Sequence, residues 1–351
     1  MNEQRLTEKQ FWALGGLAVL SPLLRLLPGR ACVLSGGGAW LSCLAALAPL
    51  GGFAVLWYFV RQKGPLGQQL TEQGTVGRIL LALLTLWFWL YGGVLLRSGA
   101  ARFVTAMNVF RGWLPYGVLL LLMAVPAALK GPKPLFRAAE IFLPVLTAVL
   151  CVSLLAAIGQ MDWRELTRIP KPGKLLHGAV PLWNLGSGML FYSGFFRTGD
   201  PPKLRKILKW LLRLSLTAAA ICAAAAGMLG AEVTAKLSQP FFVLLRNLSL
   251  SDAFERFEAL IVGMWVLPDF AMLAMLLLLS RETAESAVKK PGRMFVLPGA
   301  LMMLASAAVL GKTAFRLALW SEQIVPVATL ILTISVPLCL LLFKNSKSGS
   351  A

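Results

Sequence analysis

Residues 176–196 read LHGAVPLWNLGSGMLFYSGFF, an apolar run that the stretch NLGSG at 184–188 interrupts near its middle. A second apolar run, FWALGGLAVLSPLLRLL at residues 11–27, is interrupted by Ser21-Pro22 at a comparable depth. Glycine weakens a helix, and proline removes a backbone donor and clashes with the preceding turn. We therefore interpret both runs as helices that are broken inside a membrane.

Apolar runs of this kind recur along the whole chain, separated by glycine, proline and charged residues. A helix needs about 20 apolar residues to cross a hydrocarbon core of roughly 30 Å. Ten runs fit this requirement: residues 11–27, 39–60, 79–96, 113–129, 138–158, 176–196, 208–229, 260–279, 295–310 and 324–343. The sequence therefore predicts an all-α polytopic membrane protein with about ten transmembrane helices.

The two interrupted runs are the first and the sixth of the ten, so each begins one half of the chain. Interrupted helices at corresponding positions of two halves are typical of transporters built from inverted repeats. We expect one integral membrane domain over residues 1–351, with a first five-helix repeat at about 11–158 and a second at about 176–343.

The composition supports a membrane protein. Of 351 residues, 58% are apolar and 14% charged, whereas soluble domains carry about 25% charged residues. This excludes a soluble enzyme. The net charge of +19 is interpreted as cationic loops that face anionic membrane lipids, not as a nucleic-acid interface. With both termini in the cytoplasm, the inner segments hold 20 Lys and Arg residues and the outer ones 12, which favours that orientation.

Two polar-apolar stretches, residues 97–111 and 239–250, are expected to lie at the membrane surface as non-crossing helices. Arg25, near the end of the first run, is expected to reach the headgroups. The five cysteines form no CxxC pair and His177 is the only histidine. We therefore expect no metal site, no cofactor and no catalytic residues.

Broken helices release backbone polar groups in the membrane, and such groups bind ligands in inverted-repeat transporters. The alternative is a plain proline kink together with a glycine packing face. The predicted binding residues in the two interrupted runs are Leu20, Ser21, Pro22, Gly186, Ser187 and Gly188.

Four further candidate binding residues, Trp87, Tyr91, Trp265 and Asp269, lie in other runs. Asp269 is the deepest acidic residue in the chain and shares a predicted helix face with Trp265. With no cationic partner in sequence reach, its carboxyl group is expected to be neutral, and to couple protons or to donate a hydrogen bond. A further alternative is that Asp269 binds a ligand or a cation. Trp87 and Tyr91 either line the ligand cavity or belong to the core or the aromatic belt.

Several motifs resemble those of one family. ERFEAL at 255–260, followed by Trp265-Val266, resembles a signature of spore germination permeases, the GerAB-type B subunits of nutrient germinant receptors. LTEKQ at 6–10, WLS at 40–42 and RAAEIFLP at 137–144 are similar to family motifs in the same order. Glu255 and Arg256 of the first motif are expected to pair locally and to serve the structure.

The resemblance implies the fold of the amino-acid/polyamine/organocation transporters, which is the LeuT fold, with a small-molecule site between broken helices one and six. It also implies a bacterial cell membrane or spore inner membrane, and A- and C-type receptor subunits as partners. The chain departs from the family pattern at Gly38 and at residues 189–192, where the family often has acidic residues.

Three functions compete at this point. The first is a non-enzymatic receptor subunit that binds a nutrient such as an amino acid and signals spore germination. The second is a secondary transporter of an amino acid or a related solute. The third is a membrane transferase, which would need clustered His, Asp or Glu at a membrane face, and the sequence shows no such cluster.

Overall fold

Every secondary-structure element in the described part of the chain is a helix. The computed structural model describes residues 7–107, 112–196, 203–248 and 254–342, and only the backbone of residues 8, 105–107, 254–263 and 342. The first half contains α1 (Glu8–Arg25), α2 (Leu27–Ser35), η1 (Gly36–Gly38), α3 (Ala39–Ala45), α4 (Leu47–Gln62), α5 (Leu66–Glu72), α6 (Thr75–Met107), α7 (Leu114–Lys130) and α8 (Pro132–Ile158).

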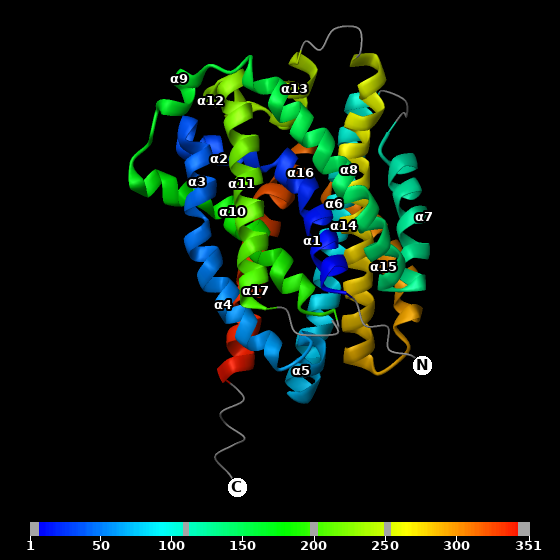
Figure 1. Ribbon diagram of the computed structural model, residues 1–351. Helices are drawn as coiled ribbons and strands as arrows, with labels where there is room; N and C mark the ends of the chain where they lie inside the picture. The colour runs from blue at the N-terminus through cyan, green and yellow to red at the C-terminus, as the bar shows by residue number, and fades with distance from the viewer. Residues whose placement is uncertain (1–6, 108–111, 197–202, 249–253, 343–351) are drawn as a thin grey trace.

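The second half begins after the short helix α9 (Trp163–Thr167). Its elements are α10 (Pro172–Ser193), α11 (Leu204–Leu229), α12 (Ala231–Lys236), α13 (Pro240–Asn247), α14 (Phe254–Val288), η2 (Gly292–Phe295), α15 (Val296–Leu310), α16 (Ala314–Leu319), η3 (Trp320–Ile324) and α17 (Val325–Leu342). The segment η3 is π-helical. Each of the ten apolar runs overlaps at least one of these helices (Figure 1).

Seven helical stretches in the described chain are long and apolar enough to cross a membrane, and they cover α2–α4, α6, α8, α11, α14, α15 and α16–α17. The apolar helix α7 is slightly shorter. α1 and α10 are outside this set, since α1 carries Glu8, Lys9 and Arg25, and α10 includes several polar, glycine and proline residues. Much of α1 and of α10 is buried against other parts of the protein, so these two helices need fewer apolar residues for contact with lipid.

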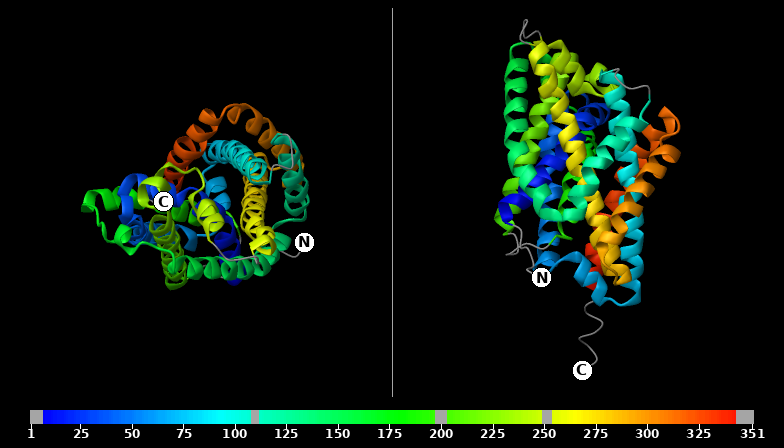
Figure 2. Two further views of the ribbon diagram at one scale, coloured as in Figure 1. Left: turned by 90° about the horizontal axis from the view of Figure 1, so that it is seen from above. Right: turned by 90° about the vertical axis from the view of Figure 1, so that its right-hand side faces the viewer.

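α1 lies inside the bundle, between α11 and α14 (Figures 1 and 2). α14 packs against α1, α6, α7 and α8, and its residues from Ala271 to Leu279 are all buried. The outer faces instead carry large exposed apolar side chains, such as Leu122, Leu155 and Leu301 at 65%, 67% and 68% exposure. Such an apolar exterior is what contact with lipid requires.

The first run is interrupted later than predicted. α1 continues through Ser21-Pro22 to Arg25, and α2 begins at Leu27, with Leu26 as the single residue between the two helices. Leu26 N donates to Pro22 O at 2.9 Å, and Arg30 N donates to Leu26 O at 3.1 Å. Helical hydrogen bonds therefore cross the junction at Leu26, and the two prolines Pro22 and Pro28 flank it.

The predicted interruption at 184–188 is wrong, because α10 runs without a break from Pro172 to Ser193. Its glycines permit close packing instead. A Cβ atom on Gly186 would lie 2.7 Å from a Leu50 methyl carbon, and one on Gly188 would lie 3.0 Å from the Thr329 methyl carbon. The glycine packing face named above as the alternative accounts for this part of the sequence.

Residues 97–107 do not form the predicted surface helix, because they are the last third of α6. Arg102 in this segment is buried at 6% exposure, where it finds an acidic partner described below. Residues 108–111 lie outside the described chain. The other predicted surface stretch contains α13, whose eight residues are too few to cross a membrane.

Candidate functional site

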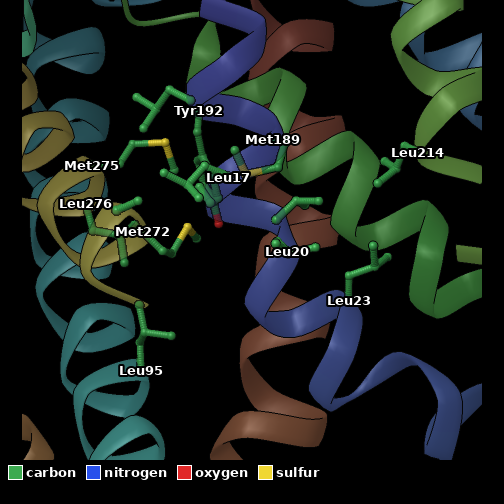
Figure 3. Packing of buried hydrophobic residues seen from close by; sticks show 14 of the residues in the cluster. Leu17, Leu20, Leu23, Leu95, Met189, Tyr192, Leu214, Met272, Met275 and Leu276 are labelled. Carbon is green, nitrogen blue, oxygen red and sulfur yellow. The ribbon is translucent and has the colours of Figure 1, made fainter. Parts of the chain in front are cut away.

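A cavity of about 470 Å³ lies between the two halves of the chain. Its walls come from α1, α2, α6, α10, α14 and the η3–α17 segment, so the first and sixth predicted crossings both contribute. Figure 3 shows Met189 and Tyr192 of α10 and Met272 of α14 converging beside α1, and all three residues line the cavity. The volume is in the range of small-molecule sites.

Three of the predicted binding residues line this cavity: Pro22, Tyr91 and Gly188. Pro22 supplies no N–H, so the carbonyl of Ala18, another wall residue, lacks its helical donor. Tyr91 stacks on Trp87, with ring centroids 6.2 Å apart, so Trp87 supports a wall residue from behind. The structure therefore brings together part of the predicted set.

The other predicted residues lie outside the cavity wall. Leu20 belongs to the hydrophobic core, and Gly186 faces Leu50 of α4. Ser187 is fully buried and donates to the Asn184 carbonyl within α10 at 3.3 Å. Trp265 packs edge-on against Phe242 of α13, with ring centroids 4.6 Å apart.

Asp269 is not the isolated acid that the sequence predicts. Arg102 Nη2 forms an ion pair with Asp269 Oδ2, and Ser21 Oγ donates to Asp269 Oδ1. Asp269 and Arg102 are 2% and 6% exposed. This cluster joins α1, α6 and α14. Gly99, one turn before Arg102, leaves room for it, because a Cβ there would lie 2.8 Å from Asp269 Oδ2.

The expectation of a neutral Asp269 is therefore replaced by a paired carboxylate. Its partner is 167 positions away in the sequence, beyond any local pattern. The side chains of Glu255 and Arg256 lie outside the described part of the chain, so their local pairing stays a prediction.

Polar groups link the cavity walls to one another. Arg30 of α2 forms an ion pair with Glu322 of η3 at 2.8 Å. Asn184 Nδ2 of α10 donates to the Pro326 carbonyl of α17 at 2.6 Å. The Tyr192 and Thr329 hydroxyls, also on α10 and α17, are 3.3 Å apart. All of these residues line the cavity, so most of its polar side chains have partners.

Among the described residues, Arg25 is the charged side chain of the cavity wall that has no ion pair. No hydrogen bond or ion pair of its guanidinium is found within the described residues, and its buried Nε has no partner. Its place in the cavity wall contradicts the expectation that it reaches the lipid headgroups. The sequence signal for Arg25 is a charged residue inside an apolar run. The same signal fits a residue in a cavity wall and a residue that reaches the headgroups.

Asn184, Tyr192 and Thr329 also line the cavity and are missing from the sequence-based set. Asn184 stands in the NLGSG stretch, so a polar residue inside an apolar run was again the signal. Tyr192 and Thr329 carry no local pattern that distinguishes them from packing residues. Their role depends on which helices lie side by side.

A bundle of membrane-length helices with a largely apolar cavity between its two halves is typical of secondary transporters. The fold agrees with this class. It is similar to the crystal structure of MhsT in complex with L-phenylalanine, with a TM-score of 0.62 and 14% sequence identity over 97% of this chain and 98% of the MhsT chain. MhsT is a transporter with the LeuT fold, so the predicted fold class is confirmed.

The family model for spore germination proteins matches residues 26–310. The chain therefore belongs to the spore germination permease family, as its motifs indicate, and is an integral membrane protein. Its family and fold are those of transporters and receptors, not of enzymes. The search of curated proteins finds no match.

Proposed function

We propose that this protein is the B-type membrane subunit of a nutrient germinant receptor, and that it binds a small nutrient such as an amino acid in the cavity between α1, α10 and α17. Binding changes how these helices pack, and this change is the signal for germination. A- and C-type receptor subunits receive the signal at a bacterial cell membrane or spore inner membrane whose lipids surround the bundle. Both chain termini face the cytoplasm.

The observation that carries the proposal is the cavity itself. It has room for an amino acid, its wall is mostly apolar, and its polar side chains come from six segments, α1, α2, α6, α10, η3 and α17. Membership of a spore germination family supports the signalling role. The complex of MhsT with L-phenylalanine shows that this fold accommodates an amino acid in another protein.

A second candidate function is secondary transport of the same kind of solute. The similarity to MhsT over nearly the whole of both chains favours it. Uptake of a bound amino acid into proteoliposomes is the discriminating measurement. A receptor subunit shows binding without uptake, and a transporter shows both.

The binding test uses the full-length protein purified in detergent and the twenty standard L-amino acids, measured by titration calorimetry. Gly188→Leu is the blocking variant, because its Cβ points to Thr329 and Tyr192 at 3.0 and 3.8 Å, and both line the cavity. Met272→Phe, from the opposite wall, is a second blocking variant. Both are expected to abolish binding.

Gly51→Leu is the matched control, because a Cβ at Gly51 meets no atom within 4 Å. It is expected to bind as the wild type does. Equal binding by the wild type and by folded Gly188→Leu and Met272→Phe would place the site elsewhere.

A further inference from the structure

We infer that the ligand carries a carboxylate group and that Arg25 is the residue that binds it. This inference rests on the proposed function and specifies the chemical class of the ligand. It starts from the three charged residues of the cavity wall, Arg25, Arg30 and Glu322. Arg30 and Glu322 neutralise each other in an ion pair, so the wall has an excess of one positive charge, located on Arg25.

The surroundings of Arg25 offer no free anion among the described residues. The acidic side chains that act on it electrostatically are Asp269 and Glu322. Asp269 is already paired with Arg102, and Glu322 with Arg30. Tyr91 also acts electrostatically on Arg25 and lines the cavity, but its side chain is a phenol and not a carboxylate. Each of these two carboxylates therefore has an arginine of its own.

An unpaired guanidinium in an apolar site is costly, because the lost hydration is not replaced by hydrogen bonds. A ligand carboxylate supplies what is missing, since arginine binds carboxylates through two parallel N–H···O bonds. The positive excess disfavours a metal cation or an amine without an acidic group. Apolar wall residues such as Val94, Leu95 and Met272 suit an apolar ligand body.

The ammonium group of an amino acid has separate acceptors in the same cavity. The Ala18 carbonyl lacks its helical donor because of Pro22, and the hydroxyl oxygens of Tyr192 and Thr329 lie across on α10 and α17. The carboxylate is the group that Arg25 requires. A simple carboxylic acid and an amino acid both meet this requirement, and the experiment separates them.

The test compares ligands that differ in one group. Each L-amino acid that binds the wild-type protein is measured beside its carboxamide, which lacks the negative charge, and L-phenylalanine is also measured beside 3-phenylpropanoate, which lacks the ammonium group. We expect the carboxamides to bind at least ~10-fold more weakly, as loss of a charge-assisted hydrogen bond predicts. Comparable binding of 3-phenylpropanoate would identify the carboxylate as sufficient.

Arg25→Met removes the guanidinium and keeps an apolar side chain of similar length. We expect it to weaken amino-acid binding ~10- to 100-fold, to abolish the preference over the carboxamide, and to leave the melting temperature unchanged or higher. Arg25→Lys is expected to recover part of the affinity, because it keeps the charge without the bidentate geometry. The control Arg281→Met removes a guanidinium that donates to the Ala128 carbonyl, away from the cavity wall, and is expected to bind normally.

Two results would overturn the inference and leave the proposed function intact. One is equal binding of amino acids and carboxamides that Gly188→Leu abolishes. The other is full amino-acid affinity in Arg25→Met. If neither the standard amino acids nor their carboxamides bind the wild-type protein, both the inference and the proposed function are wrong.

Discussion

Arg102 and Asp269 form a buried ion pair at the junction of α1, α6 and α14, and Ser21 completes it with a hydrogen bond. Two charges buried together cost hydration, and their attraction offsets that cost only while both are present. The pair therefore specifies how three helices meet more than it stabilises the bundle. This contact also explains why α6 continues as a buried helix beyond residue 97.

We predict that removing one partner of the Arg102–Asp269 pair lowers the free energy of unfolding far more than removing both partners does. Arg102→Met or Asp269→Leu alone is expected to lower the free energy of unfolding by about 3–5 kcal/mol, because one buried charge is left uncompensated. The double variant is expected to be close to the wild type. Thermal unfolding of the purified variants measures this difference.

The control for this cycle is Arg168→Met, which removes one partner of the pair between Arg168 and Glu165. Arg168 is 73% exposed, and exposed pairs contribute about 0–1 kcal/mol. Single variants of Arg102 and Asp269 as stable as the double variant would contradict a coupled pair.

α10 and α17 both line the cavity, and two contacts join them. The Asn184 amide donates to the Pro326 carbonyl, and the Tyr192 and Thr329 hydroxyls are within hydrogen-bond distance of each other. The glycines of α10 bring these helices close, since Gly188 faces Thr329. Pro326 cannot donate a backbone hydrogen bond, but its carbonyl accepts one from Asn184. The polar stretch in α10 thus connects two helices instead of breaking one.

We predict that Asn184→Leu destabilises the protein by about 0.6 kcal/mol and by no more than about 1.7 kcal/mol, the range for interhelical hydrogen bonds in membranes. Its amino-acid affinity is expected to fall as well, because the wall between α10 and α17 loosens. Ser193→Ala is the control, since the Ser193 hydroxyl bonds within α10 to the Leu190 carbonyl and lies outside the cavity wall. Unfolding and titration of both variants provide the comparison, and equal effects would contradict a link between the helices.

The whole bundle has two distinct ends. α5 lies at one end, with the start of α1 and the end of α17 in the same half, and α9 and α12 lie at the other end (Figure 1). The even number of crossings that the sequence predicts agrees with this arrangement. The distribution of Lys and Arg favours the cytoplasm for the end with α5, and this orientation stays a prediction.

We predict that single cysteines at these ends label differently. After the five native cysteines are replaced, a membrane-impermeant maleimide is expected to react with Lys171→Cys, just before α10, in intact cells. Lys63→Cys, just after α4, is expected to react only in permeabilised cells. Both positions are exposed to solvent in the structure, so access to the reagent alone decides the result. The reverse pattern would invert the proposed orientation.

The sequence by itself determined that this chain is a membrane bundle of ten apolar segments, because hydropathy and segment length are local properties of the chain. It also predicted a cavity between the first and sixth segments, and three of its ten candidate residues, Pro22, Tyr91 and Gly188, line the cavity of the structure. Ligand binding in this cavity stays a prediction. Motif order along the chain indicated the family that the comparison confirmed.

The tertiary structure decided which charges meet and which remain unpaired. The partner of Asp269 is Arg102, from another helix, and the partner of Asn184 is the Pro326 carbonyl. The same packing leaves Arg25 in the cavity wall without an acceptor among the described residues. Side-chain partners depend on the spatial order of helices, and hydropathy does not encode that order, because apolar segments are interchangeable in lipid until their small and polar residues pack together.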